Sequence, residues 1–166
     1  MVLVIRILDI PSISAIVAAV GVIVGVAFTT LEVRNLVKAR NTDLTMRLAS
    51  AWHSEGMMEK WLKVMNLEFT DYSDFKNRYG AFLSDNPEHI ALNIVLEHFE
   101  VQGYLLHRKM IDFDLADLSP VSSTWRKTKP VIEGFREECN SPRLNEWFEY
   151  LYNETQRREQ TLQAQQ

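Results

Sequence analysis

The chain of 166 residues carries 18 basic and 22 acidic side chains, a formal net charge of −4, and its length suits one compact domain. A hydrophobic fraction of 46% and an aromatic fraction of 10% exclude an intrinsically disordered chain, while 6 glycines and 5 prolines exclude a collagen-like one. One cysteine, Cys139, excludes an internal disulfide framework and a zinc ribbon, and the acidic balance argues against a nucleic-acid partner.

The N-terminal region predicts a membrane helix. We interpret residues 1–9 as an interfacial segment, too short to span a bilayer. The 22 residues from Ile10 to Leu31 carry no charge. As a helix they rise about 33 Å, enough for a hydrocarbon core of about 30 Å, and predict a transmembrane helix over residues 10–32. The alternatives are a cleaved signal peptide, which has a shorter apolar region and a basic flank before it, and a buried core helix.

The charges that flank the predicted span set its orientation. Residues 33–47 hold four basic side chains against one acidic one, a net charge of +3, whereas residues 1–32 have a net charge of −1. The positive-inside rule then places the N-terminus outside the cell and the rest of the chain in the cytoplasm, as in a single-pass plasma-membrane protein. Residues 48–166 have a net charge of −6, which suits a solvated domain.

Small residues recur at +4, +3 and +4 along one face of the predicted span: Ser14, Ala18, Gly21 and Gly25. Such a small-xxx-small pattern lets membrane helices approach closely, so it predicts a homo-oligomer with this face as the contact. The same face continues through Thr29 to Glu32. In a ring of subunits, Ser14, Thr29 and Glu32 would line a cation-selective pore, since acidic rings favour cations. The third interpretation is an inert anchor, with Glu32 marking the membrane interface.

Helical periodicity continues through the rest of the chain. Residues 33–66 are expected to form a juxtamembrane helix, interrupted, if at all, near residues 41–43 or near Gly56. Residues 67–152 predict a cytoplasmic helical domain, and residues 153–166 a polar tail that frays.

The cytoplasmic domain is expected to contain several helices. A short one ends near Leu83, and a central one, apolar on most faces, runs from Pro87 to about Lys109. Further helices are expected over residues 112–118, from about 121 to 138, and from Ser141. No strand pattern of any length occurs. The predicted fold class is therefore all-α, with one N-terminal transmembrane helix running into a small cytoplasmic helical bundle.

A set of mostly packing residues carries a family resemblance: Leu92, Asn93, Leu96, Glu97, Phe99, Glu100, Gly103, Ile111, Asp112, Trp125, Pro130, Ile132, Arg136, Pro142, Arg143 and the run from Trp147 to Leu151. The chain resembles an uncharacterised family of small prokaryotic proteins with one N-terminal membrane helix and a cytoplasmic helical domain. The resemblance covers about residues 86–151 together with the span. It implies no established activity, and therefore no catalytic residues to carry over.

Familiar catalytic signatures are absent from the sequence: it has no phosphate-binding loop, dinucleotide-binding fingerprint, nucleophile elbow or zinc-protease motif. The four histidines have no second histidine at +3 or +4, and no glutamate stands three residues before any of them. We therefore expect no metal and no cofactor. Cys139 has no evident activating base, so we interpret it as a structural thiol.

The strongest chemical pattern is a polar stripe at +4, +3, +4 and +3 on the central helix: Asn93, Glu97, Glu100, Tyr104 and His107. Two carboxylates one turn apart, beside a tyrosine and a histidine, suit acid–base catalysis or cation binding. The simpler interpretation is a solvated face, or one paired with basic residues of the next helices. In a buried stripe, the expected ion pair joins Glu97 to Arg136. Trp52 and Trp61 are candidate partner contacts.

Three functions follow from these patterns. The first is a membrane-anchored, self-associating helical scaffold or sensor module, not an enzyme, with membrane lipid, copies of itself and an unidentified protein as partners. The second is a homo-oligomeric cation-conducting pore lined by the face of Ser14, Thr29 and Glu32. The third is a membrane-anchored enzyme that uses the carboxylates of Glu97 and Glu100.

Overall fold

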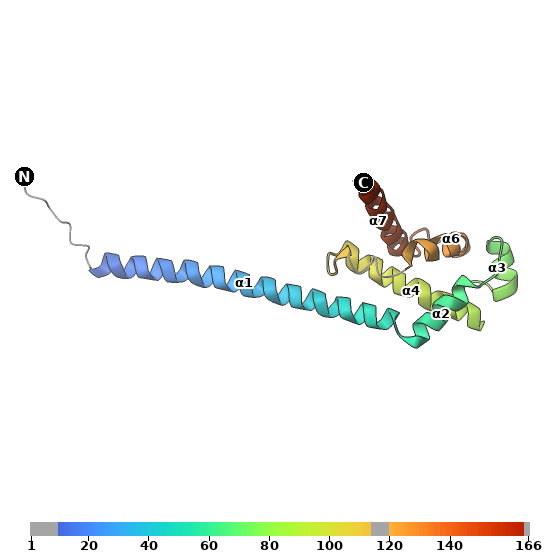
Figure 1. Cartoon of the computed structure of the whole chain (residues 1–166), viewed down its shortest axis with the longest axis horizontal. Coiled ribbons are helices and arrows are strands. Elements are labelled where there is room, and N and C mark those ends of the chain that lie inside the picture. Colours follow the sequence, from blue (N-terminus) through green and yellow to red (C-terminus); the bar gives the residue numbers. More distant parts are fainter. Residues whose placement is uncertain (1–9, 114–119, 165–166) are drawn as a thin grey trace, which may run out of the picture. The chain divides into compact units, whose positions relative to one another are not determined.

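The structure, a computed structural model, describes residues 10–113 and 120–164, with side chains from Ser14 onward (Figure 1). The expected interfacial segment 1–9 and most of the expected helix 112–118 lie outside these residues. The described part holds six helices and no strand, so the fold is all-α as predicted. The helices are α1 (Ile10–Trp52), α2 (Glu55–Met65), α3 (Tyr72–Tyr79), α4 (Pro87–His107), α6 (Val121–Glu138) and α7 (Glu146–Gln163).

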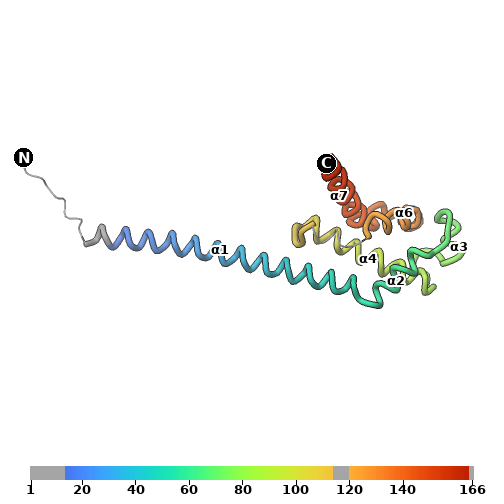
Figure 2. The backbone as a smooth tube through the Cα atoms, viewed as in Figure 1, coloured from blue at the N-terminus to red at the C-terminus, as the bar shows by residue number. Residues whose placement is uncertain are grey.

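Two compact units make up the chain, one of residues 1–40 and one of residues 41–166. We call them unit 1 and unit 2. In its described part, unit 1 is the N-terminal portion of α1. Unit 2 holds the last turns of α1 and the other helices, whose connections can be followed along the backbone in Figure 2.

Of the two places considered for an interruption, residues 41–43 lie inside an unbroken α1. The Asp43 carboxylate pairs one turn on with Arg47 at 2.9 Å, an interaction that supports a continuous helix. The helix is interrupted at His53 and Ser54, close to Gly56, which was the second place. The Ser54 hydroxyl accepts a hydrogen bond from the backbone N–H of Met57 and so caps α2.

The core of unit 2 is built around α4, which packs against α2 and α7, while α6 packs against α7 and α3 (Figure 1). The apolar residues that α4 buries include Leu92, Val95, Leu96 and Phe99, which confirms it as the central helix. Trp52, expected as a partner contact, is only 5% exposed and lies 5.3 Å from the ring of Phe99. Trp61 is half-buried and donates its indole N–H to Thr124. Both tryptophans therefore belong to the fold of unit 2.

The end of the chain is more ordered than expected. Helix α7 continues through residues 153–163 and does not fray at Asn153. Thr155 is buried and donates its hydroxyl to the carbonyl of Leu151, and Gln156 donates to the Ser122 hydroxyl of α6 at 3.0 Å. These contacts of polar residues hold the helix in place where the apolar pattern has ended.

Helices α4 and α7 cross at Gly103. A methyl group at this position would lie 1.9 Å from the carbonyl oxygen of Trp147, so the two backbones touch. One turn away, the rings of Phe99 and Phe148 stack at 4.7 Å. Only glycine permits this approach, and the stacked pair fills the space beside it.

We expect Gly103→Ala to lower the free energy of unfolding by about 3 kcal/mol, because the rigid backbone opposite must move. Gly56→Ala is the matched control. A methyl group there would meet nothing closer than the tip of the Lys60 side chain at 3.7 Å. This control should raise stability by up to about 1 kcal/mol, since alanine restricts the unfolded chain. Thermal unfolding in mild detergent, followed by tryptophan fluorescence, measures both, and equal effects would contradict the close crossing.

His89 is a polar residue in an aromatic core. It is 0% exposed and packs against the rings of Phe75 and Phe135, with centroids 5.7 and 5.3 Å away. Neither of its ring nitrogens makes a hydrogen bond within the part of the chain that the structure describes. Burial lowers the pKa of His89, and the nearby carbonyls of Tyr79 and Gly80 oppose that change only in part. The folded state therefore favours the neutral ring.

We expect acid to destabilise unit 2 through His89. Below a pH of about 6.5 the unfolded chain takes up a proton that the folded chain resists, so the free energy of unfolding falls as the pH falls. His89→Leu should raise stability by about 1 kcal/mol at neutral pH and weaken this acid sensitivity. Part of the sensitivity should remain, because burial also lowers the pKa of His98. Melting curves from pH 7 to 5 test this, with the exposed His53→Gln as the control; an unchanged pH profile in His89→Leu contradicts it.

Candidate functional site

The N-terminal part of α1 is an apolar helix without cover. Between Ser14 and Trp52 it contains an 18-residue window with a mean hydropathy of 2.3, and none of that window is buried. By length and composition it can cross a membrane. Nine large apolar side chains in its membrane-length part are 53–68% exposed: Ile16, Val17, Val20, Val22, Ile23, Val24, Val26, Phe28 and Leu31.

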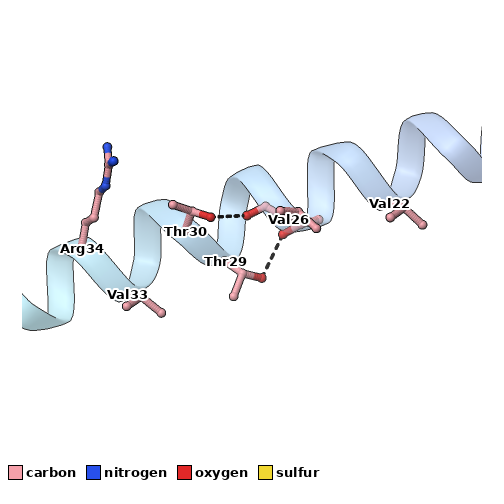
Figure 3. A pocket seen from close by; sticks show the side chains of 7 residues that line it. Val22, Val26, Thr29, Thr30, Val33 and Arg34 are labelled. Atoms are coloured by element: carbon pink, nitrogen blue, oxygen red, sulfur yellow. Dashed lines mark hydrogen bonds between the residues drawn. The ribbon is translucent and has the colours of Figure 1, made fainter.

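The predicted association face is open in unit 1. Methyl groups added at Gly21 or Gly25 would meet nothing within 4 Å, so no contact in the described chain requires glycine there. Gly25 lines a shallow notch in the helix surface, and Figure 3 shows Val22, Thr29 and Val33 on one side of the helix. We call this the Gly25 notch. Its full lining is Val22, Gly25, Val26, Thr29, Thr30, Val33 and Arg34.

The residues of the pore hypothesis, Ser14, Thr29 and Glu32, are all exposed on α1. The Thr29 hydroxyl donates to the carbonyl of Gly25 at 2.9 Å, and Thr30 bonds the carbonyl of Val26 at 2.8 Å in the same way (Figure 3). Both threonines thus satisfy their hydroxyl protons within their own helix. A contact face and a pore lining both remain compatible with this geometry.

In unit 2 the structure divides the predicted polar stripe of α4 between two surroundings. Its C-terminal members lie against α7: Tyr104 packs on Trp147 at 5.7 Å, and His107 packs on Trp147 at 4.5 Å and on Tyr150 at 5.2 Å. Its N-terminal members, Asn93 and Glu97, line a separate hollow. The five residues therefore do not form a single site.

Glu100 caps α7 from outside that helix. Asn145, at the cap position, has a left-handed backbone with φ 54° and no capping hydrogen bond from its side chain. The Glu100 carboxylate accepts instead from the backbone N–H of Phe148 at 2.8 Å. Burial raises the pKa of Glu100, an effect that the N–H groups of Phe148 and Trp147 partly offset. The carboxylate has a structural role that sequence spacing did not reveal.

Asn93 and Glu97 belong to a hollow of about 200 Å³ beside α4, which we call the α4–α6 hollow. Its walls come from α4, α6, the turn before α4 and the turn before α7. The lining residues are Phe82, Leu83, Asn93, Leu96, Glu97, Phe135, Leu144 and Asn145.

The expected pair between Glu97 and Arg136 is wrong. The guanidinium of Arg136 bonds Glu149 at 2.8 Å and donates to the carbonyl of Leu144, also at 2.8 Å. The turn after α6 brings the acidic first turn of α7 to Arg136, which a reading of α4 alone could not show. Glu97 has no hydrogen bond or ion pair with any described residue.

Among the described residues, no group of three or more histidine, cysteine, aspartate or glutamate side chains is placed to hold a metal ion. Cys139 is half-buried at the C-terminal end of α6. Sequence reasoning missed two features of this region. No local sequence pattern indicates that Glu100 caps α7. The polar stripe does contain Asn93 and Glu97 of the hollow, but the other residues that line the hollow come from segments far away in the sequence.

Comparisons with known proteins place the chain in a family. The sequence model described as "Domain of unknown function (DUF4760)" matches residues 14–155, which includes both the apolar helix and nearly all of unit 2. No curated protein and no solved structure matches the chain.

The two neighbouring glutamates of α4 should respond differently to substitution. We expect Glu100→Ala to lower the free energy of unfolding by about 1–2 kcal/mol, because the first turn of α7 loses its cap. Glu100→Gln should lose less, since an amide oxygen still accepts from Phe148 and carries no charge to bury. Glu97→Ala, the matched control, should stay within about 0.5 kcal/mol of the native chain. Thermal unfolding measures all three; equal losses at both positions would contradict the division of the stripe.

Proposed function

The chain belongs to the DUF4760 family, whose description assigns no activity, and we propose from its geometry that it is a single-pass membrane protein. Helix α1 anchors the helical module of unit 2 at the membrane and associates with copies of itself. The observation that carries this proposal is the uncovered apolar surface of α1.

The cost of leaving this surface in water supports the anchor. Nine large apolar side chains are more than half exposed. At about 1–2 kcal/mol each, their exposure costs on the order of 10 kcal/mol. That equals the whole net stability of a typical domain, about 5–15 kcal/mol. Lipid removes this cost without any protein cover.

Two observations support a helix that stays part of the protein and is not cleaved off as a signal peptide. The family match begins at residue 14, so the apolar helix is part of the shared domain. The basic residues also follow the helix, with Arg34, Lys38 and Arg40 in the next turns, whereas a cleaved signal carries its basic residues before the apolar region. By the positive-inside rule, the same charges support a cytoplasmic position for unit 2.

Self-association is supported by the Gly25 notch. In lipid, helices gain little from the hydrophobic effect and associate where small residues let their backbones pack closely. Gly21 and Gly25 have no packing role inside the described chain, so a second copy of α1 supplies a reason for them. The side chains that border the notch are of a size to interlock with those of an identical helix.

An enzyme that uses the two carboxylates has less support. Glu100 accepts a backbone hydrogen bond from α7, and Glu97 lies on the α4–α6 hollow. The pore remains the second candidate, because the Gly25 notch serves a dimer and a ring of subunits equally. The number of subunits distinguishes a packed dimer from a pore-forming ring.

Cysteine chemistry in cells tests the anchor. The native Cys139, the single cysteine of the chain, should react with a membrane-impermeant maleimide only after the cells are permeabilised. The protein should also stay in the membrane fraction during alkaline extraction. Labelling of Cys139 in intact cells would contradict the cytoplasmic placement, and release by alkali would contradict the anchor.

A second experiment tests self-association in the same membranes, with Cys139 replaced by serine. Ala18→Cys should give crosslinked dimers under oxidation, and a ladder of higher adducts would favour the pore. Ile23→Cys should not crosslink, because it points about 160° away from Gly25 on the helix. Adding Gly25→Leu should reduce the Ala18→Cys adduct at least fivefold, whereas Val24→Leu should leave it unchanged. Equal crosslinking at residues 18 and 23 would contradict association through this face.

A further inference from the structure

We propose that the α4–α6 hollow of unit 2 binds a small organic cation, an ammonium group carried on a compact apolar or aromatic body. This inference concerns unit 2 by itself. It does not depend on the membrane anchor or on self-association, so a negative result here would leave both of those proposals unchanged.

The charge of the lining selects the ligand class. Three polar side chains face the hollow, those of Asn93, Glu97 and Asn145, and none makes a hydrogen bond with a described residue. Glu97 is the only charged residue among the lining residues, and no basic residue is among them. The nearest arginine on α6, Arg136, is occupied by Glu149 and by the carbonyl of Leu144. The open acceptors therefore suit a cation that carries hydrogen-bond donors.

The rest of the lining is apolar and aromatic. The rings of Phe82 and Phe135 meet edge to face, with centroids 5.1 Å apart, and Leu96 and Leu144 complete the wall. Phe135 is buried, so the half-buried ring of Phe82 is the one available to attract an ammonium group and to hold an apolar body. A carboxylate beside this ring recognises an organic ammonium group better than a bare metal ion, which needs several oxygen ligands.

The size of the hollow limits the ligand. At about 200 Å³ it falls below the range of about 300–1,000 Å³ that holds drug-sized molecules. The ligand is therefore a small amine with about one ring or an aliphatic body of similar size.

The rim of the hollow also carries a residue with a strained backbone. Leu83 has a φ of 64° and is 75% exposed, an unusual state for a bulky apolar residue. It lies at the third position of a turn that is closed by a hydrogen bond from the Ser84 N–H to the Ala81 carbonyl. Glycine or asparagine would adopt this conformation with less strain. In our proposal this leucine supplies an apolar contact to a ligand in the hollow.

The test uses the full-length protein in a mild nonionic detergent, titrated with 4-fluorobenzylamine and followed by fluorine NMR of the probe. We expect binding with a dissociation constant of about 1 mM or lower, in the range that a ligand of this size reaches. The neutral probe 4-fluorobenzyl alcohol, which has the same ring, should bind about fivefold more weakly. Partition of either probe into the detergent is the same for all variants.

Two variants locate the binding. Glu97→Gln should weaken the amine about fivefold and leave the alcohol unchanged, whereas Glu59→Gln, an exposed glutamate on α2, should change neither. Leu83→Gly should raise the melting temperature but weaken both probes about threefold, because strain and rim contact are lost together. Equal binding of amine and alcohol, wild-type affinity in Glu97→Gln, or no saturable binding up to about 10 mM would each overturn the proposal.

Discussion

At Gly103 the backbones of α4 and α7 come so close that one methyl group would meet the carbonyl oxygen of Trp147 at 1.9 Å. This crossing determines what the neighbouring residues do. It brings Glu100 to the free N–H groups at the start of α7, where the left-handed Asn145 provides no side-chain cap. It also stacks Phe99 on Phe148. The Glu100 carboxylate, which the sequence spacing assigned to acid–base catalysis or cation binding, thus caps the start of α7.

The same crossing separates the polar stripe of α4 into two parts. Tyr104 and His107 lie against the rings of α7, although both side chains stay exposed, whereas Asn93 and Glu97 line the hollow on the side of α6. The turn that leads into α7 lines the same hollow with Leu144 and Asn145. The α4–α6 hollow is therefore a consequence of where α7 begins, and its polar residues remain unpaired because Arg136 is drawn to α7.

Local patterns predicted the fold class and the central helix well, because apolar periodicity and the cap of Asn86 before Pro87 act within a few residues. These patterns failed for features that depend on contacts between residues far apart in the sequence. The spacing of α4 could not show that Arg136 meets Glu149, or that Trp52 is enclosed by unit 2. The helical end of the chain depends on contacts such as that of Gln156 with Ser122, which no amphipathic pattern records. The hollow joins residues as far apart in the sequence as Phe82 and Asn145, beyond the reach of any motif.

Glycines in the two units are explained by different surroundings. In unit 2, Gly103 lies against the backbone of α7, and a methyl group at Gly134 would meet the Tyr72 ring at 2.0 Å. Close packing within unit 2 therefore explains both Gly103 and Gly134. Gly21 and Gly25 have open space around them, on a helix whose large side chains are equally uncovered. A helix interior without such a contact favours alanine over glycine by about 1 kcal/mol, so packing within the described chain gives no reason for these two glycines. In the function that we propose, lipid covers the exposed valines and isoleucines, and a second copy of the helix packed into the Gly25 notch is the reason for the glycines.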